Sequence, residues 1–332
     1  MQTYDSLPKP FFVLAPMDDV TDTVFRQIVE ECAPADLNFT EFVNVDGLQS
    51  PGRTKLLKKL RFTEGEKPLM AQLWGKDPEN FRKTAQEIAD GTFAKELGLP
   101  EGVNFAGVDL NMGCPQKTEV KNGACCALIN NRELATAIIQ ATKEGLNGNL
   151  PLSIKTRTGY GAVDMTWPEF LLKQRIDMLT IHGRTKAQMS KVPADWEVIG
   201  QIRELRDKLS PGTLLVGNGD VVSRQQGKEL AKKYNLDGIM IGRGIFHDPF
   251  VFSENSLWES FTARQRIDLY KKHVELFAAT WQNRERPVQT LNRFCKVYIQ
   301  NFDGAKEFRE QLMKASNTNE LLRLLSAKLE VV

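Results

Sequence analysis

Eight short apolar runs, separated by stretches with helical periodicity, most strongly constrain what this chain can fold into. Runs of this length, many of them rich in β-branched residues, are typical of parallel strands buried on both faces. The predicted strands are residues 11–17, 37–43, 68–74, 107–113, 151–157, 178–184, 214–220 and 238–244. Eight such units in about 250 residues match the usual size of a (β/α)8 TIM barrel. A doubly wound open sheet is the alternative, but its first strand would normally lead into a glycine-rich turn, where this chain reads APMDDVTD.

The segments between the predicted strands carry helix start signals. Asp77 precedes a proline and can cap one helix, and Asn131 can begin another. After about residue 255 the strand-like runs stop, and residues 257–332 have the pattern of three or four helices. The sequence therefore predicts a TIM barrel over residues 1–255 and a small all-α C-terminal domain over residues 256–332.

Composition limits the class of protein. With 41% hydrophobic and 26% charged residues, the chain can bury a core, which excludes a disordered protein. We find no run of about 18 apolar residues, so no membrane span is expected. The start, MQTYDSLPKPFF, lacks the pattern of a secretory signal, and five scattered cysteines do not suggest a disulfide framework. We expect a cytoplasmic protein, and nothing in the sequence demands more than a monomer.

Polar or conformationally special residues stand where each predicted strand ends, which is where barrel enzymes place their active sites. They are Met17 and Asp18, Glu41, Gln72, Asn111 and Cys114, Lys155 and Arg157, His182 and Arg184, Asn218 and Asp220, and Gly242 and Arg243. One such residue could be a satisfied buried group, but eight sets on one rim predict a polar active site.

The last two predicted strands end in the glycine-bearing turns GNGD (217–220) and IGRG (241–244). In this fold, the loops after strands seven and eight usually bind phosphate, because backbone N–H groups can approach closely where glycines leave room. The two turns together predict a bound phosphate, to which Arg243 can add a charge-assisted contact.

Lys155 and Arg157 share the parity of the fifth predicted strand, so both should point into the barrel. Two cations there need an anionic or electron-rich ligand. Lys155 could form a Schiff base, as in aldolases, or hold an electron-rich ring system as a cation. The surrounding residues leave both interpretations open.

Cys114 lies just past the fourth predicted strand, in the sequence NMGCP. Free cysteines are usually small buried hydrophobes, yet a thiol with a pKa near ~8.5 is mostly protonated at neutral pH and can donate a proton. The residues alone leave both roles open. For the adjacent Cys125 and Cys126, core packing is favoured over metal binding because no second ligand pair accompanies them. No metal site is predicted.

Taken together, the motifs resemble those of one known family. LAPMDDVTD, TEF, DLNMGCPQKTEVKNGACCAL, SIKTRTG, HGRTKAQ, GNGD and MIGRG occur in the order and strand positions of the tRNA-dihydrouridine synthases, bacterial type. The resemblance covers essentially the whole chain and is most specific around Cys114. The stretch TEFVNV and the overall length resemble the branch that acts on U16.

This resemblance implies flavin mononucleotide (FMN) in the barrel mouth and NADPH-dependent reduction of particular uridines in tRNA to dihydrouridine. Hydride would pass from the flavin to C6, and Cys114 would protonate C5. The implied FMN-binding residues are Pro16, Met17, Asp18, Gln72, Lys155, His182, Asn218, Gly219, Asp220, Gly242 and Arg243. Asn111 and Arg157 would face the uracil, and Lys117, Arg184, Lys186 and Arg293 are further candidates for tRNA contact.

The sequence departs from the family pattern at two places. Cys125 and Cys126 stand where the family more often has Gly, Ala or Ser, and residues 292–294 replace a commoner basic-basic-histidine triplet. The alternatives to a tRNA reductase are a flavin barrel acting on a free pyrimidine, as dihydropyrimidine or dihydroorotate dehydrogenases do, a flavin-free aldolase-type barrel, and a non-catalytic RNA-binding module.

Overall fold

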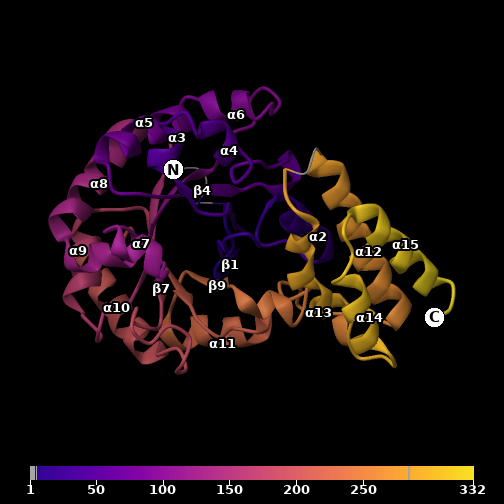
Figure 1. Cartoon of the computed structure of the whole chain (residues 1–332). Helices are drawn as coiled ribbons and strands as arrows, with labels where there is room; N and C mark the ends of the chain where they lie inside the picture. The colour runs from indigo at the N-terminus through magenta and orange to yellow at the C-terminus, as the bar shows by residue number, and fades with distance from the viewer. Residues whose placement is uncertain (1–3, 5, 283–284) are drawn as a thin grey trace. The chain divides into compact units, whose positions relative to one another are not determined.

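A closed parallel barrel forms the first part of the computed structural model, which describes residues 4, 6–282 and 285–332 (Figure 1). Its strands are β1 (Phe11–Leu14), β2 (Asn38–Phe39), β3 (Val43–Asn44), β4 (Leu69–Trp74), β5 (Gly107–Met112), β6 (Leu152–Arg157), β7 (Met178–His182), β8 (Leu214–Asn218) and β9 (Gly238–Ile241). The sheet order is β1-β9-β8-β7-β6-β5-β4-β2, and β3 also pairs with β4. Leu37 closes the ring on β1, because its N–H donates to Phe12 O at 3.2 Å and its O accepts from Leu14 N at 3.1 Å. The predicted TIM barrel is confirmed.

A bulge separates β2 from β3, which together fill one strand position of the barrel. Phe39 pairs with Met70 and Val43 with Leu73, so three residues of one strand oppose two of the other. The extra residue leaves one backbone group of β4 without its usual ladder partner. This group is the Gln72 N–H, which donates to the Thr40 hydroxyl oxygen at 3.0 Å instead. The bulge therefore holds the rim of the barrel next to Gln72.

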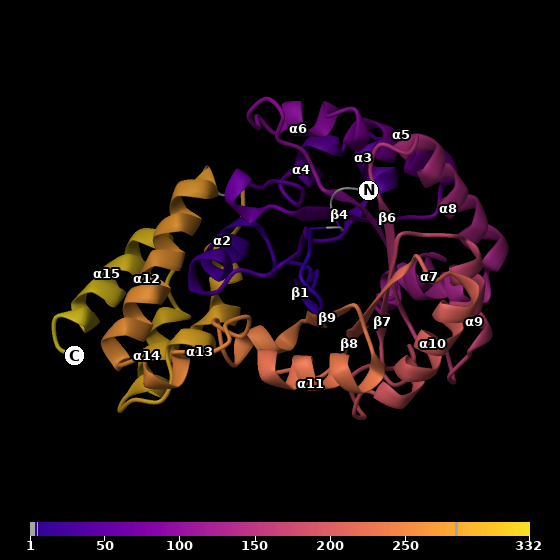
Figure 2. The same ribbon diagram turned by 180° about the vertical axis from the view of Figure 1, so that it is seen from behind.

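Helices surround the strands on the outside of the barrel (Figures 1 and 2). They are α3 (Val45–Leu48), α4 (Arg53–Leu57), α5 (Pro78–Ala89), α6 (Thr92–Glu96), α7 (Lys117–Lys121), α8 (Arg132–Leu146), α9 (Thr166–Lys173), α10 (Trp196–Leu209) and α11 (Arg224–Tyr234). The predicted caps are present: the Asp77 side chain accepts from the N–H groups of the first turn of α5, and Asn131 does the same for α8. These caps satisfy backbone donors that a helix N-terminus leaves unpaired.

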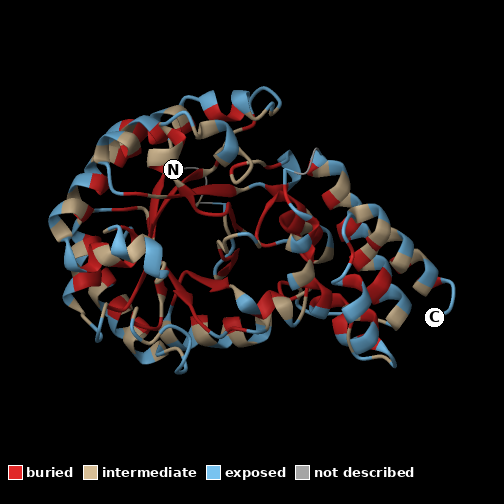
Figure 3. Ribbon diagram, viewed as in Figure 1, coloured by how far each residue is buried: buried red, intermediate tan, exposed pale blue. Residues whose placement is uncertain are grey.

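The barrel core consists of the side chains that point inward from alternate strand positions. Phe11, Val13, Ala15, Leu37, Phe39, Met70, Met178, Val216 and Met240 form one cluster. Figure 3 shows the strands as almost continuously buried, while the helices alternate between buried and exposed residues. Each fully buried Phe or Met contributes about 1.5–3 kcal/mol relative to leaving it exposed, so this cluster stabilises the barrel from within.

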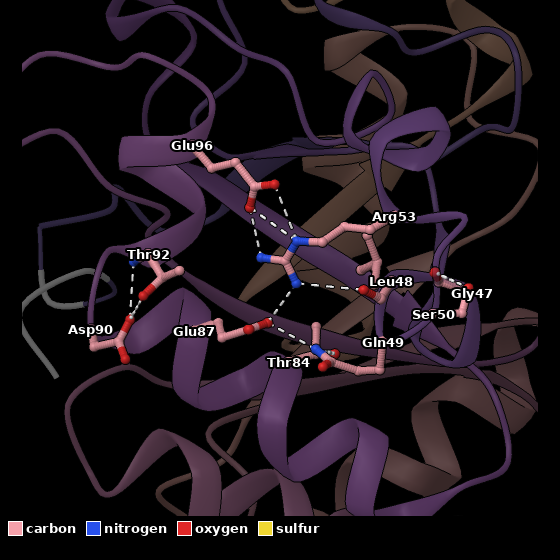
Figure 4. A network of polar contacts seen from close by, with 10 residues as sticks. All are labelled: Gly47, Leu48, Gln49, Ser50, Arg53, Thr84, Glu87, Asp90, Thr92 and Glu96. Atoms are coloured by element: carbon pink, nitrogen blue, oxygen red, sulfur yellow. Dashed lines mark hydrogen bonds and ion pairs between the residues drawn. The ribbon is translucent and has the colours of Figure 1, made fainter.

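A polar network fastens α4 to the outside of the barrel (Figure 4). The Arg53 guanidinium donates to Glu96 Oε2 at 2.6 Å and to Glu87 Oε2 at 2.9 Å. It also lies 4.2 Å from the centre of the Phe93 ring, and Gln49 Nε2 donates to the same Glu87 oxygen at 2.8 Å. Two carboxylates and an aromatic face thus hold one planar cation, a geometry that suits arginine better than lysine.

The chain divides into two compact units. Residues 1–23 and 35–242 form the barrel unit, and residues 24–34 and 243–332 form the second. The second unit contains most of α2 (Thr23–Cys32) together with α12 (Ala263–Thr280), the 3₁₀ helix η6 (Val288–Phe294), α13 (Cys295–Tyr298), α14 (Ala305–Leu312) and α15 (Thr318–Leu329). This division differs from the sequence boundary after residue 255. Phe25 of α2 stacks on Phe294, with ring centres 4.8 Å apart, and Phe246 contacts both rings, at 6.4 Å from Phe25 and 6.3 Å from Phe294. Among the described residues, the structure contains no helix of sufficient length and apolarity to cross a membrane.

Burial in the second unit lowers the pKa of His273 to about 3. The unfolded chain takes up a proton near pH 6.5 and the folded one does not, so stability is lost as pH falls below 6.5. We expect the wild type to lose about 2 kcal/mol more than His273→Gln between about pH 7.5 and about pH 5. Urea unfolding of both proteins at the two pH values measures this difference. Equal losses would contradict the assignment of a neutral, buried His273.

Gly145 lets α8 approach α5 closely. A Cβ at this position would lie 2.1 Å from the Arg82 carbonyl oxygen and 3.0 Å from Ala85 Cβ. Because the first of these atoms belongs to the backbone, Gly145→Ala should lower the free energy of unfolding by about 2–3 kcal/mol. Gly212→Ala is the matched control, since no atom of the residues that the structure describes lies within 4 Å of its Cβ position. Chemical denaturation should leave that control within about 0.5 kcal/mol of the wild type.

Candidate active site

Polar side chains replace apolar ones on the inward face of the strands toward their carboxyl ends. The register pairs Gln72 with Asp109 and Asp109 with Ser153, and it pairs Asn111 with Lys155. One step further along, Arg157 pairs with His182 and His182 with Asn218. These positions have the same parity as the core cluster, so the barrel core passes directly into a polar mouth. The mouth residues are Gln72, Asp109, Asn111, Ser153, Lys155, Arg157, His182 and Asn218.

A chain of hydrogen bonds crosses this face and ends on the backbone of Cys114. Asp109 Oδ1 accepts from the Ser153 hydroxyl at 2.5 Å, and Asp109 Oδ2 accepts from Gln72 Nε2 at 2.7 Å. Gln72 Oε1 accepts from Asn111 Nδ2 at 3.2 Å. Asn111 Oδ1 in turn accepts from the Cys114 N–H at 2.9 Å. The predicted site residues Gln72, Asn111 and Cys114 are therefore brought together.

Lys155 and Asp109 carry opposite charges in the mouth. Burial lowers the pKa of Lys155 to about 8, the positive charge of Arg157 acts in the same direction, and the Asp109 carboxylate opposes both. Burial also raises the pKa of Asp109 to about 6, against its bonds from Ser153 and Gln72. Between these two pKa values both groups are ionised. The mouth then presents a lysine cation backed by a buried carboxylate.

Cys114 is half-buried, whereas Cys125 and Cys126 are fully buried. The Cys114 carbonyl accepts from the Cys126 N–H at 3.3 Å, which ties the loop after β5 to the following 3₁₀ helix. A hydrogen bond with the Cys125 thiol lowers the pKa of Cys114 and raises that of Cys125. Of these three thiols, Cys114 is the one with solvent access and the more acidic member of a contacting pair.

Arg157, which the resemblance places against the uracil, is buried among backbone carbonyl groups in the structure. Its side chain is 7% exposed, and Nε donates to the Gly113 carbonyl at 2.9 Å. Nη1 donates to the carbonyls of Thr185 at 3.1 Å and Met189 at 3.2 Å. A buried guanidinium needs such acceptors. Arg157 therefore joins the loop that carries Cys114 to the loop after β7.

Arg184, expected on the exposed rim, is buried instead, with 3% exposure. Its Nε donates to the Val192 carbonyl at 2.6 Å, its Nη1 lies 3.1 Å from His182 Nε2, and its Nη2 pairs with the Asp220 carboxylate. Asp220 Oδ2 also accepts from the Ala194 N–H at 2.9 Å. The sequence could not place Arg184 because the loop that covers it, including Val192, lies beyond the end of the strand.

The two predicted phosphate turns differ in why they contain glycine. Gly219 has φ +139°, and a Cβ there would lie 2.5 Å from Ala194 Cβ, so the protein's own packing demands glycine. At Gly242 a Cβ would meet only Ala15 Cβ at 3.5 Å and Met17 Sδ at 3.9 Å, which are ordinary contacts. Gly242 continues the inward parity of β9, and the protein's own packing does not require glycine at this position.

The remaining predicted residues lie at the end of β8, on loops and at the start of a short helix. Pro16, Met17 and Asp18 are half-buried, and the Met17 N–H donates to Thr21 Oγ1 at 2.9 Å. Asp18 forms an ion pair with Lys59. The other positions are Asn218, whose Nδ2 donates to the Met240 carbonyl at 2.8 Å, and the exposed Arg243, which directly follows Gly242.

Cations predicted to contact RNA are found in both units. In the barrel unit, Lys117 is exposed at the start of α7, and Lys186 places its Nζ 4.6 Å from the centre of the Tyr160 ring. In the second unit, Arg293 and Lys296 are both exposed, while the two residues between them are buried. Their shared exposure is the arrangement that the sequence spacing predicts.

Sequence reasoning did not single out Asp109 and Ser153 as site residues. Both stand two positions before a predicted site residue on the same strand, Asn111 in one case and Lys155 in the other. A polar residue at inward parity within an otherwise apolar strand is the signal that could have found them.

Comparison with known proteins shows which family the chain resembles over nearly its whole length. The family described as Dihydrouridine synthase (Dus) matches residues 13–331. The chain is 45% identical over 322 residues to "Probable tRNA-dihydrouridine synthase 2" of Bacillus subtilis (strain 168), covering 96% of this chain and 94% of that protein. It is 43% identical over 325 residues to "Probable tRNA-dihydrouridine synthase" of Staphylococcus aureus (strain COL), covering 97% and 94%.

Among solved structures, histamine dehydrogenase from Rhizobium sp. 4-9 matches with a TM-score of 0.53 and 14% sequence identity, covering 80% of this chain and 48% of that one. This likeness concerns the fold alone, and it supports the barrel. The family match over nearly the whole chain and the identity to curated relatives confirm the resemblance that the motifs carry. This chain belongs to the dihydrouridine synthase family of enzymes.

Proposed function

We propose that this protein reduces the C5=C6 bond of specific uridines in tRNA to give 5,6-dihydrouridine, with FMN as its resident cofactor and NADPH as the electron donor. Membership of the dihydrouridine synthase family supports the reaction class. The observation that carries the proposal is the half-buried Cys114 thiol, held at the barrel mouth by Asn111 and Gln72 on the same inward face as Lys155. The U16 target remains a prediction from the sequence.

The chemistry of the mouth fits FMN. When bound, this group supplies the hydride that the reaction places on C6. Lys155 provides a cation for the electron-rich edge of a ring system. Gln72 is 0% exposed and bonds to Asp109 and Asn111 through its two amide atoms, so it supports the mouth from beneath. Because packing within the protein does not require glycine at position 242, close approach of a ligand group is the role proposed for Gly242, and Arg243 follows it along the chain. The proposed FMN set also keeps Pro16, Met17, Asp18, His182, Asn218, Gly219 and Asp220.

Cys114 supplies the proton of the reaction. Reduction of C5=C6 adds a hydride at C6 and a proton at C5, so an acid must stand at the face opposite the hydride source. Contact with the Cys125 thiol makes Cys114 a stronger acid and stabilises the thiolate that remains after transfer. Solvent then returns a proton to the thiolate. NADPH supplies the two electrons and solvent supplies the proton, so the reduction is balanced.

Arg157 and Asn111 act on the loop that carries this acid. Arg157 holds the Gly113 carbonyl and Asn111 holds the Cys114 N–H. Asn111 is 8% exposed as a residue, and we propose that it also meets the uracil. A uridine within folded tRNA must leave its stack to reach these groups.

Cys114→Ala is expected to keep FMN, seen as absorbance at about 450 nm, and to lose turnover by about 100-fold or more. The loss follows from removal of the acid, with the rest of the mouth left in place. Nucleoside mass spectrometry of tRNA treated with FMN-loaded protein and NADPH measures dihydrouridine. Cys32→Ala, a half-buried cysteine of the second unit, is the matched control and should retain wild-type activity. Undiminished dihydrouridine formation in Cys114→Ala would refute the role of the thiol.

Arg293→Glu combined with Lys296→Glu is expected to weaken tRNA binding about tenfold and to lower the salt dependence of binding by about two counterions. Both side chains are exposed in the second unit and can meet phosphates. Lys306→Glu with Lys314→Glu makes the same change of charge at two other exposed positions of that unit. Electrophoretic binding assays at several salt concentrations compare the pairs. An equal loss of tRNA affinity in both double variants would show that net charge, and not the position of Arg293 and Lys296, weakens binding.

A further inference from the structure

The hydrogen-bond chain from Ser153 to Cys114 has only one consistent direction, and Asp109 sets it. An ionised carboxylate only accepts hydrogen bonds, so Gln72 must present its NH2 group to Asp109. The Gln72 carbonyl then faces Asn111, which must present its own NH2 group. The Asn111 carbonyl is left to accept from the backbone N–H of Cys114.

The hydrogen bonds at the Cys114 end of this series require the same orientation of the amide groups. Asn111 Oδ1 accepts from two backbone N–H groups, those of Gly113 at 3.1 Å and Cys114 at 2.9 Å, and backbone N–H groups only donate. A reversed Asn111 amide would place two donors face to face. Both ends therefore require the same orientation of Gln72 and Asn111, which is how a fully satisfied buried network specifies one arrangement.

Bulk solvent does not reach this part of the barrel. Asp109, Gln72 and Ser153 are all 0% exposed. If the acceptor at position 109 is lost, the Gln72 NH2 group becomes a buried donor without a partner, which is costly. Gln72 must then turn toward another acceptor, and its bond to Asn111 breaks.

We propose that Asp109 is a positioning residue that, by orienting Gln72 and Asn111, fixes the loop on which the Cys114 thiol meets the substrate. This inference rests on the proposed function for its activity readout, whereas the position of the thiol can be measured without turnover. The carboxylate also acts on the charge of Lys155, so the test must separate orientation from charge. Ser153 assists by occupying Asp109 Oδ1, which leaves Oδ2 for Gln72.

Two substitutions at position 109 separate orientation from charge. Asp109→Leu removes the acceptor and keeps the branched shape of the side chain, with some gain in volume. Asp109→Asn keeps an acceptor for Gln72 when its NH2 group turns toward the Ser153 oxygen, and so it should rescue much of the loss. Thr180→Val is the matched control, because Thr180 is 0% exposed, is the register partner of Lys155, and has a hydroxyl that finds no hydrogen-bond partner among the described residues.

Three measurements on the full-length, FMN-loaded protein test the proposal. Alkylation of Cys114, followed on its peptide by mass spectrometry, should be at least about threefold faster in Asp109→Leu, because the loop opens more readily. Dihydrouridine formation at saturating tRNA should fall by about 100-fold, with KM for tRNA within about twofold of the wild type. Asp109→Asn should stay within about tenfold of the wild type, and Thr180→Val should match it.

Wild-type alkylation and turnover in Asp109→Leu would overturn the inference. A loss in Asp109→Asn as large as in Asp109→Leu would also overturn it, since charge rather than orientation would then be at work. If Asp109→Leu does not fold, Gln72→Leu breaks the next link, and unchanged alkylation of Cys114 there is equally decisive. If the wild type makes no dihydrouridine while alkylation still responds to position 109, the proposed function fails and the positioning role stands.

Discussion

The parallel register of the barrel strands is the constraint on which the rest of the structure depends. Neighbouring strands pair residue by residue, so side chains of one parity form continuous rows around the inside of the barrel. The rows toward the amino ends of the strands are apolar and form the core, and the rows toward the carboxyl ends are polar. Because a shift by one residue would turn each row outward, the same pairing that buries Met70 and Val216 also assembles the polar mouth.

Burying charged groups next to a hydrophobic core is costly, and the structure offsets this cost by pairing and hydrogen bonding. Asp109 is fully buried but receives two hydrogen bonds and lies near Lys155. Arg157 and Arg184 are buried with backbone carbonyls as acceptors. Each of these arginines stabilises the loops around the mouth, because it bonds to two loops that the sheet does not connect. Rigid loops of this kind suit an acid that must meet a substrate at a defined place.

Much of the fold followed from local patterns. Each predicted strand overlaps an observed one because apolar runs of strand length have few alternatives once helical periodicity is absent. The bulge around Glu41 could not be predicted, because it depends on how Thr40 meets the Gln72 N–H across the sheet. Nor could the placement of α2 with the later helices, since its contact between Phe25 and Phe294 joins residues far apart in the chain. For the site, strand ends located Gln72, Asn111, Lys155 and His182, whereas the burial of Arg184 depends on a loop.

The sequence by itself determined the barrel, its family and the positions that can carry the chemistry, because strand periodicity and motif order are local properties of the chain. Only the tertiary structure decided which polar groups bond to one another. Asp109 is an ordinary acidic residue in the sequence DLN until the register places Gln72 on one side of it and Ser153 on the other. The direction of the hydrogen bonds to Cys114 then follows from one physical fact: a buried carboxylate can only accept.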